Sequence, residues 1–365
     1  MSIHKIQTGA EGTLPAPAVQ VSLTHELGDL ADVIVRTRAV QAFDHAARHF
    51  PIHRLVRCAV QRELEAVFDD LALEMGCGAQ RLEVGSLLLD GPGVFIQGEG
   101  HRKGGYCSCW FKIWSDTRER ADEMRARILR IVGDQRFRSK MFIIDWHFRA
   151  GSGHLHSTSF DEIADDLLLD EAYPSLGTGV GAFIAAYLAA QDTVLILQGP
   201  PGTGKTRLVR AILAALSKRK GDSAMIMYTA DQRALTSDEI FVDFITGAHD
   251  AFVIEDADHL LKARTSGNTE LHRFLAIADG VVRAQGRKII FTTNLPNITD
   301  IDDALLRPGR CYAVKNLRSL EIMEANLLTR RLCGADVERL ARAQAALDSA
   351  GGKTRTVAQV YRACA

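Results

Sequence analysis

The stretch "GPPGTGKT" at residues 199–206 constrains the fold of this chain more than any other feature. It follows the apolar segment "TVLILQ" and precedes "RLVRAILAALSKRK", which repeats apolar residues at helical spacing. Glycines in such a loop let backbone N–H groups curl around a phosphate, and the helix adds the positive end of its dipole. The sequence therefore predicts a strand, a phosphate-binding loop and a helix in direct succession.

The side chains at the end of this loop indicate which nucleotide chemistry to expect. Lys205 is expected to reach the β and γ phosphates, and Thr206 to offer its hydroxyl to Mg²⁺. ATP and Mg²⁺ are accordingly the expected cofactors. The predicted nucleotide-binding residues are Gly199, Pro200, Pro201, Gly202, Thr203, Gly204, Lys205, Thr206 and Arg207.

The remainder of the second half alternates between strand and helix patterns. The strand candidates are 193–198, 224–230, 251–255, 288–293 and 311–317. Their runs are apolar without alternation, which is typical of a parallel sheet covered by helices on both faces. We therefore predict an α/β P-loop NTPase subdomain over residues 173–317, followed by a helical lid over 318–365.

A second strand, "AFVIEDAD", ends in carboxylates at a plausible distance from the loop. The acid that closes the strand should hold Mg²⁺, and the next one should orient the attacking water. On that register Glu255 is the metal acid and Asp256 the water acid, although the usual order is Asp then Glu. A rival register assigns the metal to Asp256 and the water to Asp258. We prefer the first, because the rival needs a residue between the two acids.

Two further segments carry polar groups suited to a phosphoryl anion. "KIIFTTN" places Asn294 at the end of a strand, where its amide can hold the lytic water or the γ phosphate. "DIDDALLRPGR" carries Arg307 and Arg310, whose guanidinium groups keep their charge at any working pH. Asp256, Asn294, Arg307 and Arg310 are thus the candidate catalytic residues.

Together, "GPPGTGKT", "FVIEDAD", "FTTN" and "ALLRPGR" resemble the AAA ATPase family in order and approximate spacing. The resemblance implies that Lys205 and Thr206 are Walker A residues, Glu255 and Asp256 Walker B acids, and Asn294 the sensor 1 residue. It implies that Arg307 and Arg310 are arginine fingers, which in the family act on the nucleotide of the neighbouring subunit. A hexameric or heptameric ring that hydrolyses ATP to ADP and phosphate is therefore expected.

Within the family, the stretch "DGVVRAQGRKIIFTTNLPNITDIDDALLRPGR" is most similar to the subfamily that translocates the Rieske protein into the cytochrome bc complex. That subfamily carries an N-terminal membrane span, for which we find no candidate here, so the resemblance covers the ATPase module only. For a sensor 2 residue, Lys353 and Arg355 are candidates, although a solvated turn is the preferred interpretation.

The first part of the chain resembles no family that we can name. Residues 1–20 are polar and expected to be disordered, and 151–172 are expected to form a linker. Between them, 21–150 are predicted to form an α+β domain that opens with a helical hairpin broken at Pro51. In "HRKGGYCSCWFKIW" we expect a β-hairpin whose Trp110 and Trp114 pack in the core, the alternative being a platform for single-stranded nucleic acid.

Composition limits the partners. The 365 residues carry a net charge of −1, so no excess of positive charge indicates nucleic acid. The seven cysteines are scattered and are expected to be reduced thiols. We also find no apolar run long enough to span a bilayer. Both observations favour a cytoplasmic protein.

We therefore expect a homo-oligomeric ATPase ring that remodels or translocates a protein client bound through the N-terminal domain. Two alternatives stay open. One is an AAA ATPase that acts on nucleic acid, and the other is a nucleotide-gated scaffold with little turnover.

Overall fold

The computed structural model describes residues 52–81, 84–133, 141–151, 153–164, 168–262, 271–279 and 286–365, with the side chains of 276–279 excepted. The expected disorder of residues 1–20 and the expected helix before Pro51 lie outside these ranges. The chain divides into two compact units, Met1–Gly133 and Asp134–Ala365, which are described separately.

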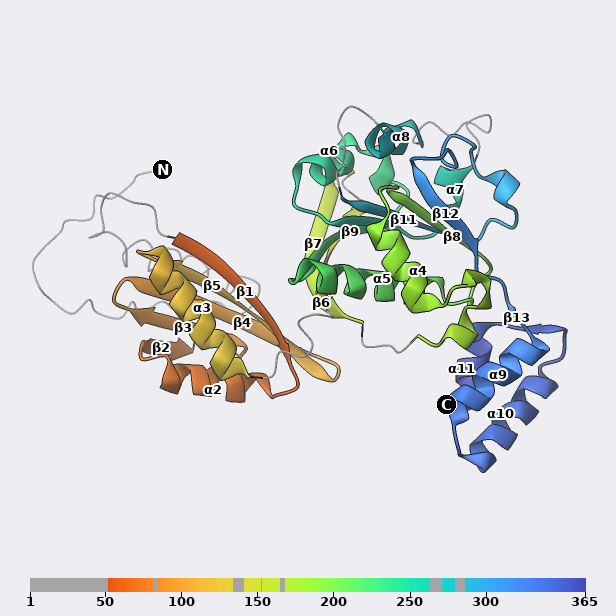
Figure 1. Cartoon of the computed structure of the whole chain (residues 1–365). Helices are drawn as coiled ribbons and strands as arrows, with labels where there is room; N and C mark the ends of the chain where they lie inside the picture. Colours follow the sequence, from red (N-terminus) through yellow and green to blue (C-terminus); the bar gives the residue numbers. More distant parts are fainter. Residues whose placement is uncertain are drawn as a thin grey trace, which may run out of the picture. The chain divides into compact units, whose positions relative to one another are not determined.

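The first unit contains an antiparallel sheet with strand order β1-β5-β4-β3-β2 (Figure 1). Helices α2 and α3 pack on one face of this sheet, where Val67, Phe68 and Ile128 meet Phe111 and Ile113. The predicted α+β character of this region is therefore present. The elements are β1 (Ile52–Val60), α2 (Leu64–Glu74), β2 (Gly78–Arg81), β3 (Ser86–Gly91), β4 (Val94–Lys103), β5 (Tyr106–Ser115) and α3 (Arg118–Val132).

The prediction of a helix that resumes directly after Pro51 is wrong over its first part. Residues 52–60 form β1, which pairs with β5 along its whole length, and the helix begins only at Leu64. In "IHRLVRCAV" the apolar residues fit both a helical and an alternating period, because the segment is short. Pairing with β5 decides the outcome, and it places Val56, Cys58 and Val60 in the core.

The predicted placement of the two tryptophans in the core is also wrong. Side chains alternate along β5, so Cys107, Cys109 and Phe111 face the helices and are buried. Trp110 and Trp114 share a face as expected, but it is the opposite face, and both are half-buried there. The two cysteines are free thiols packed as small apolar groups, as predicted.

The second unit is built on a seven-stranded sheet with strand order β12-β8-β11-β10-β9-β6-β7 (Figure 1). Neighbouring strands are parallel, except that β7 is antiparallel to β6. The P-loop NTPase fold and its mainly parallel sheet are thus confirmed. The strands are β6 (Met141–Arg149), β7 (Leu155–Ile163), β8 (Val194–Gln198), β9 (Ala224–Thr229), β10 (Ala251–Ile254), β11 (Lys288–Thr293) and β12 (Cys311–Asn316).

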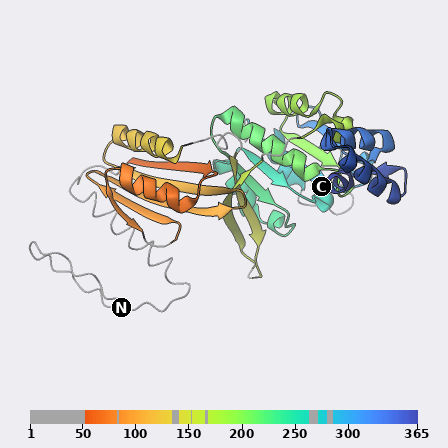
Figure 2. The same cartoon turned by 90° about the horizontal axis from the view of Figure 1, so that it is seen from below.

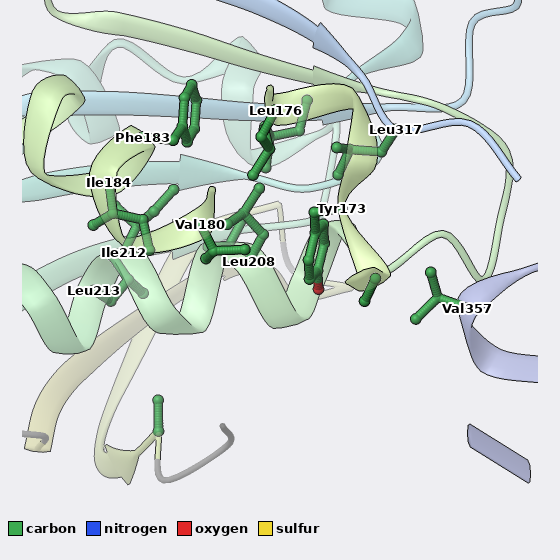
Figure 3. Close-up of a cluster of buried hydrophobic side chains, with 14 of the residues drawn as sticks. Tyr173, Leu176, Val180, Phe183, Ile184, Leu208, Ile212, Leu213, Leu317 and Val357 are labelled. Atoms are coloured by element: carbon green, nitrogen blue, oxygen red, sulfur yellow. The ribbon is translucent and has the colours of Figure 1, made fainter. Parts of the chain in front are cut away.

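Helices cover both faces of this sheet, because its central strands are apolar on both sides (Figure 2). Leu195 and Leu197 of β8 face α4 and α5, whereas Val194 and Ile196 face α6 and α8. Figure 3 shows the first of these layers, where Val180 and Ile184 of α4 lie beside Leu208 and Ile212 of α5. The helices are η3 (Asp170–Ala172), η4 (Pro174–Leu176), α4 (Val180–Ala189), α5 (Lys205–Lys220), η5 (Ala234–Thr236), α6 (Asp238–Thr246), α7 (Asp258–Leu261), α8 (Leu271–Asp279) and η7 (Ile298–Asp300).

The predicted domain boundary at residue 150 and the linker over 151–172 are contradicted by the sheet. Strand β6 pairs in parallel with β9, and β7 falls inside the supposed linker. His249 contacts the Asp145 carboxylate of β6 with Nε2 at 2.8 Å, so the hairpin is also tied to the unit by side chains. The sequence predicted the first strand but assigned it to the N-terminal domain, and it missed β7, whose residues are mostly polar and exposed.

The C-terminal part forms the expected helical lid from α9 (Ile322–Cys333), α10 (Val337–Ser349) and α11 (Val357–Cys364), with a two-stranded sheet of β13 (Leu320–Glu321) and β14 (Thr354–Arg355). Arg355 is buried and donates to the carbonyl oxygens of Leu347, Gly351, Gly352 and Thr354. It therefore holds the turn after α10 together, which contradicts both the sensor 2 and the solvated-turn interpretations. Lys353 is exposed, as a solvated turn predicts.

Within the described residues, no helix combines the length and the apolar character that crossing a bilayer requires.

Candidate nucleotide site

The loop at 199–206 leads from the end of β8 into the first turn of α5, as the sequence predicts. Gly204 precedes that turn with φ of +90°, and a Cβ there would stand 2.7 Å from the hydroxyl of Tyr173. That hydroxyl donates to the Gly204 carbonyl at 3.1 Å, so the buried Tyr173 side chain stabilises the loop through a hydrogen bond. A residue with a side chain at position 204 is excluded by both backbone conformation and space.

Lys205 lies at the centre of the site. Its Nζ donates to the Gly199 carbonyl at 2.6 Å, to the Pro200 carbonyl at 3.2 Å and to Asn294 Oδ1 at 2.8 Å. Burial lowers the pKa of Lys205, and the carboxylates of Asp256, Asp258 and Glu255 oppose that shift. The ammonium group therefore stands among acids and carbonyls that hold it where phosphate would bind.

Thr206 and Glu255 form the first of two polar pairs. Thr206 Oγ1 donates to Glu255 Oε1 at 2.8 Å, across from the loop to the end of β10. A hydroxyl and a carboxylate are the hard oxygen donors that suit Mg²⁺, which takes its remaining ligands from phosphate and water. No cluster of three or more His, Cys, Asp or Glu side chains that could hold a metal is found among the described residues. The donor set thus fits a metal that arrives with its nucleotide.

Asp256 and Asn294 form the second pair. Asn294 Nδ2 donates to Asp256 Oδ1 at 3.1 Å, while Asn294 Oδ1 accepts from Lys205. Asp256 is exposed and has φ of +50°, and it is the one non-glycine residue with positive φ in the part of the chain that the structure describes. Aspartate and asparagine tolerate this left-handed region better than other side chains do. The local backbone therefore favours a short acid after Glu255.

The acid of the rival register has a different partner set. Asp258 Oδ1 accepts from Thr293 Oγ1 at 2.5 Å and from the Asn294 N–H at 2.8 Å. Both donors belong to the segment that carries Asn294. Asp258 therefore anchors that segment, whereas Asp256 and Glu255 present their carboxylates beside Asn294 and Thr206.

A cavity of about 460 Å³ runs along these groups and ends against the lid. On the lid side, the Ala358 N–H donates to the Gly202 carbonyl at 2.9 Å. The Arg207 guanidinium lies over the ring of Tyr361, with its central carbon 4.2 Å from the ring centroid. This contact connects α5 with α11 of the lid. The residues that line the cavity are Pro201, Gly202, Gly204, Lys205, Thr206, Arg207, Glu255, Asp256, Thr292, Asn294, Val357, Ala358 and Tyr361. The volume is within the usual range of ligand-binding clefts.

The two candidate arginine fingers lie elsewhere and differ from each other. Arg307 is exposed, whereas Arg310 is half-buried and donates to the Ala304 carbonyl at 2.8 Å. The backbone carbonyl of Arg310 also accepts from the N–H groups of Thr193 and Val194. Neither arginine lines the cavity beside Lys205 of its own chain.

Several residues of the site could not be found from motifs. Tyr173, Tyr228 and the lid residues Ala358 and Tyr361 all touch groups of the site. Of these four residues, Tyr228 alone gives a weak indication in the sequence, because it lies near the end of a predicted strand. That strand, β9, pairs with β10, which leads to the two acids. The lid residues come from a distant segment, and only the folded lid brings them to the loop.

A phosphate loop that joins a strand to a helix, beside a hydroxyl–carboxylate pair on a mainly parallel sheet, defines a P-loop NTPase domain. Residues 195–318 match the model of the "ATPase family associated with various cellular activities (AAA)". The chain therefore contains an AAA ATPase domain, of the class that binds and hydrolyses ATP.

Known relatives agree with this assignment. An ATPase family gene 2 protein of Schizosaccharomyces pombe is 33% identical over 125 residues, covering 32% of this chain and 15% of that protein. The peroxisomal ATPase PEX6 of Mus musculus is 28% identical over 220 residues, covering 57% and 20%. A 26S proteasome regulatory subunit 8 homolog of Naegleria fowleri is 30% identical over 182 residues, covering 46% and 40%. The chain thus spans less than half the length of each of these relatives.

Proposed function

We propose that this protein is an ATP-hydrolysing ring, hexameric or heptameric, that remodels or translocates a protein client. The observation that carries the proposal is the pairing of Thr206 with Glu255 and of Asn294 with Asp256 around Lys205. One pair suits a metal-bound phosphate and the other suits an attacking water. Binding and hydrolysis of ATP therefore have distinct residues in one cavity.

In this proposal each group has one task. Lys205 neutralises the β and γ phosphates. Thr206 and Glu255 would hold Mg²⁺, which would offset charge on the leaving phosphates. Asp256 accepts a hydrogen bond from the lytic water and takes its proton. Asn294 donates to Asp256 and thereby fixes that carboxylate relative to Lys205.

For the arginines we propose a division of labour. Arg307 is exposed and away from its own cavity, which suits a guanidinium that serves the nucleotide of a neighbouring copy. Arg310 bonds the turn at Ala304 and shapes the segment that presents Arg307. We therefore propose Arg307 alone as the arginine finger and a structural role for Arg310.

The proposal of a protein client rests on the relatives and on a likeness in sequence. The names of two relatives place them at the peroxisome and the 26S proteasome, and the likeness of residues 279–310 to the Rieske-protein translocases supports a protein as client. The α+β unit of residues 52–133 is the proposed recognition domain. The seven free cysteines support the cytoplasm as the expected compartment.

The order of the two acids tests the assigned register. The double change Glu255→Asp with Asp256→Glu should lower the hydrolysis rate by about 10- to 100-fold, because misplacing the catalytic acid by about 1 Å has effects of that size. Glutamate at position 256 also fits the left-handed backbone less well than aspartate does.

The measurement pairs steady-state hydrolysis with binding of a fluorescent ATP analogue in both proteins. Binding should persist, because Lys205 and the loop are unchanged. If the double variant binds no nucleotide but remains folded, the register is wrong.

A nucleic-acid-acting ATPase is the second candidate, favoured by one observation. Trp110 and Trp114 are half-buried on the sheet face away from the helices, with His101 and His53 rings beside them at 5.6 and 5.4 Å. The chain as a whole carries a net charge of −1, which gives no excess of positive charge for a phosphate backbone. The protein-client proposal is therefore preferred.

This choice predicts that single-stranded DNA or RNA leaves the hydrolysis rate unchanged. The rate should be measured with and without oligonucleotide at several salt concentrations. Stimulation that weakens with salt and disappears on Trp110→Ala would favour the second candidate.

A further inference from the structure

Both oxygens of the Glu255 carboxylate accept a hydroxyl group. Thr206 Oγ1 donates to Oε1 at 2.8 Å, and Tyr228 Oη donates to Oε2 at 2.8 Å. The threonine belongs to the nucleotide loop, whereas the tyrosine comes from β9. We propose that Tyr228 is a positioning residue that holds Glu255 with Oε1 toward Thr206 and the Mg²⁺ of the bound nucleotide. This inference rests on the proposed function.

The need for a second anchor follows from the unusual order of the acids. Glutamate has one more rotatable bond than the aspartate usual at this position, and ordering a longer side chain costs more conformational entropy. Its backbone is held by the bond from the Glu255 N–H to the Thr229 carbonyl at 3.0 Å, which leaves the carboxylate free to rotate. The bond from Thr206 restricts that rotation at Oε1, and the bond from Tyr228 restricts it at Oε2.

The geometry of the sheet lets Tyr228 reach this carboxylate. Tyr228 pairs with Val253 of β10, two residues before Glu255, so its long side chain extends along the strand direction to the acid. On its other side Tyr228 pairs with Trp146 of β6, and the two rings meet edge to face at 6.5 Å. The β6–β7 hairpin therefore supports the ring of Tyr228, which bonds Glu255.

The test is Tyr228→Phe, which removes one hydroxyl and keeps the ring against Trp146. The Mg²⁺ concentration that gives half-maximal hydrolysis should rise by about 3- to 10-fold, as expected for loss of one hydrogen bond that is only part of the site. Binding of a fluorescent ATP analogue in EDTA should not change. Tyr312→Phe is the matched control, because Tyr312 lies on β12 of the same sheet with its ring against Phe183 and Tyr187. It should leave the Mg²⁺ requirement unchanged.

A double-mutant cycle separates positioning from packing. In a Glu255→Asp background the shorter carboxylate withdraws from Tyr228, so Tyr228→Phe should have little further effect on the Mg²⁺ requirement. An equal effect in both backgrounds, or an unchanged Mg²⁺ requirement in Tyr228→Phe alone, overturns the inference. If unmodified protein hydrolyses no ATP in the presence of Mg²⁺, the proposed function fails, whereas normal hydrolysis with an unchanged Mg²⁺ requirement in Tyr228→Phe overturns the inference alone.

Discussion

Replacing Asp256 with asparagine is expected to lower ATP hydrolysis by about 10²- to 10⁴-fold, the usual contribution of a positioned general base. Asparagine has the same size and also tolerates the positive φ at this position. Its Oδ1 can still accept the bond from Asn294 Nδ2. The change therefore removes the proton acceptor with little effect on the backbone or on Lys205, Thr206 and Glu255.

Binding and turnover should consequently separate in Asp256→Asn. Steady-state phosphate release and titration with a fluorescent ATP analogue measure the two quantities. Asp348→Asn is a suitable control, since it neutralises an exposed carboxylate on the lid helix α10. If Asp256→Asn hydrolyses ATP at the unmodified rate, Asp256 is not the water acid. A retained ATP complex would also serve to capture the client.

The second large effect is expected for Arg307→Ala, which should lower turnover by about 10³-fold or more, as removal of an arginine finger does. Nucleotide affinity should change little, because Arg307 does not line the cavity of its own chain. Arg310→Ala should act differently. It removes the bond to Ala304 and should lower the thermal unfolding midpoint.

Hydrolysis rate, nucleotide affinity and assembly size should be measured together for these variants. Arg342→Ala on the exposed face of α10 is the matched control and should behave as unmodified protein. If Arg307→Ala retains full turnover as an assembled protein, the finger assignment is wrong.

The nucleotide loop and its acids could be predicted because their chemistry is local. Backbone N–H groups, a lysine and a threonine must follow one another to hold a phosphate, so the proposed phosphate-binding residues 199–206 occupy consecutive positions. Glu255, Asp256 and Asn294 each end a strand of one parallel sheet, and the ends of such strands meet at the same edge. Their pairing in the structure follows from that rule.

The errors concern features that depend on a distant partner. Residues 52–60 become a strand because β5 pairs with them, and the hairpin of β6 and β7 joins the second unit because β9 does. The face that Trp110 presents is set by which side of the sheet α2 and α3 cover. Tyr228 gave no motif, because its role depends on β9 lying beside β10. Only tertiary contacts settle such cases.

The central claim is that ATP is hydrolysed between copies of this chain, and mixing two inactive variants tests it most directly. Lys205→Ala keeps Arg307, and Arg307→Ala keeps an intact loop, so a mixed ring contains complete sites where the two meet. With random assembly at equal amounts, about a quarter of the sites should be complete, since each partner is the right one half of the time. The mixture should therefore regain a corresponding part of the hydrolysis rate. Mixtures that stay at background, while both variants assemble to the size of the unmodified protein, would contradict it.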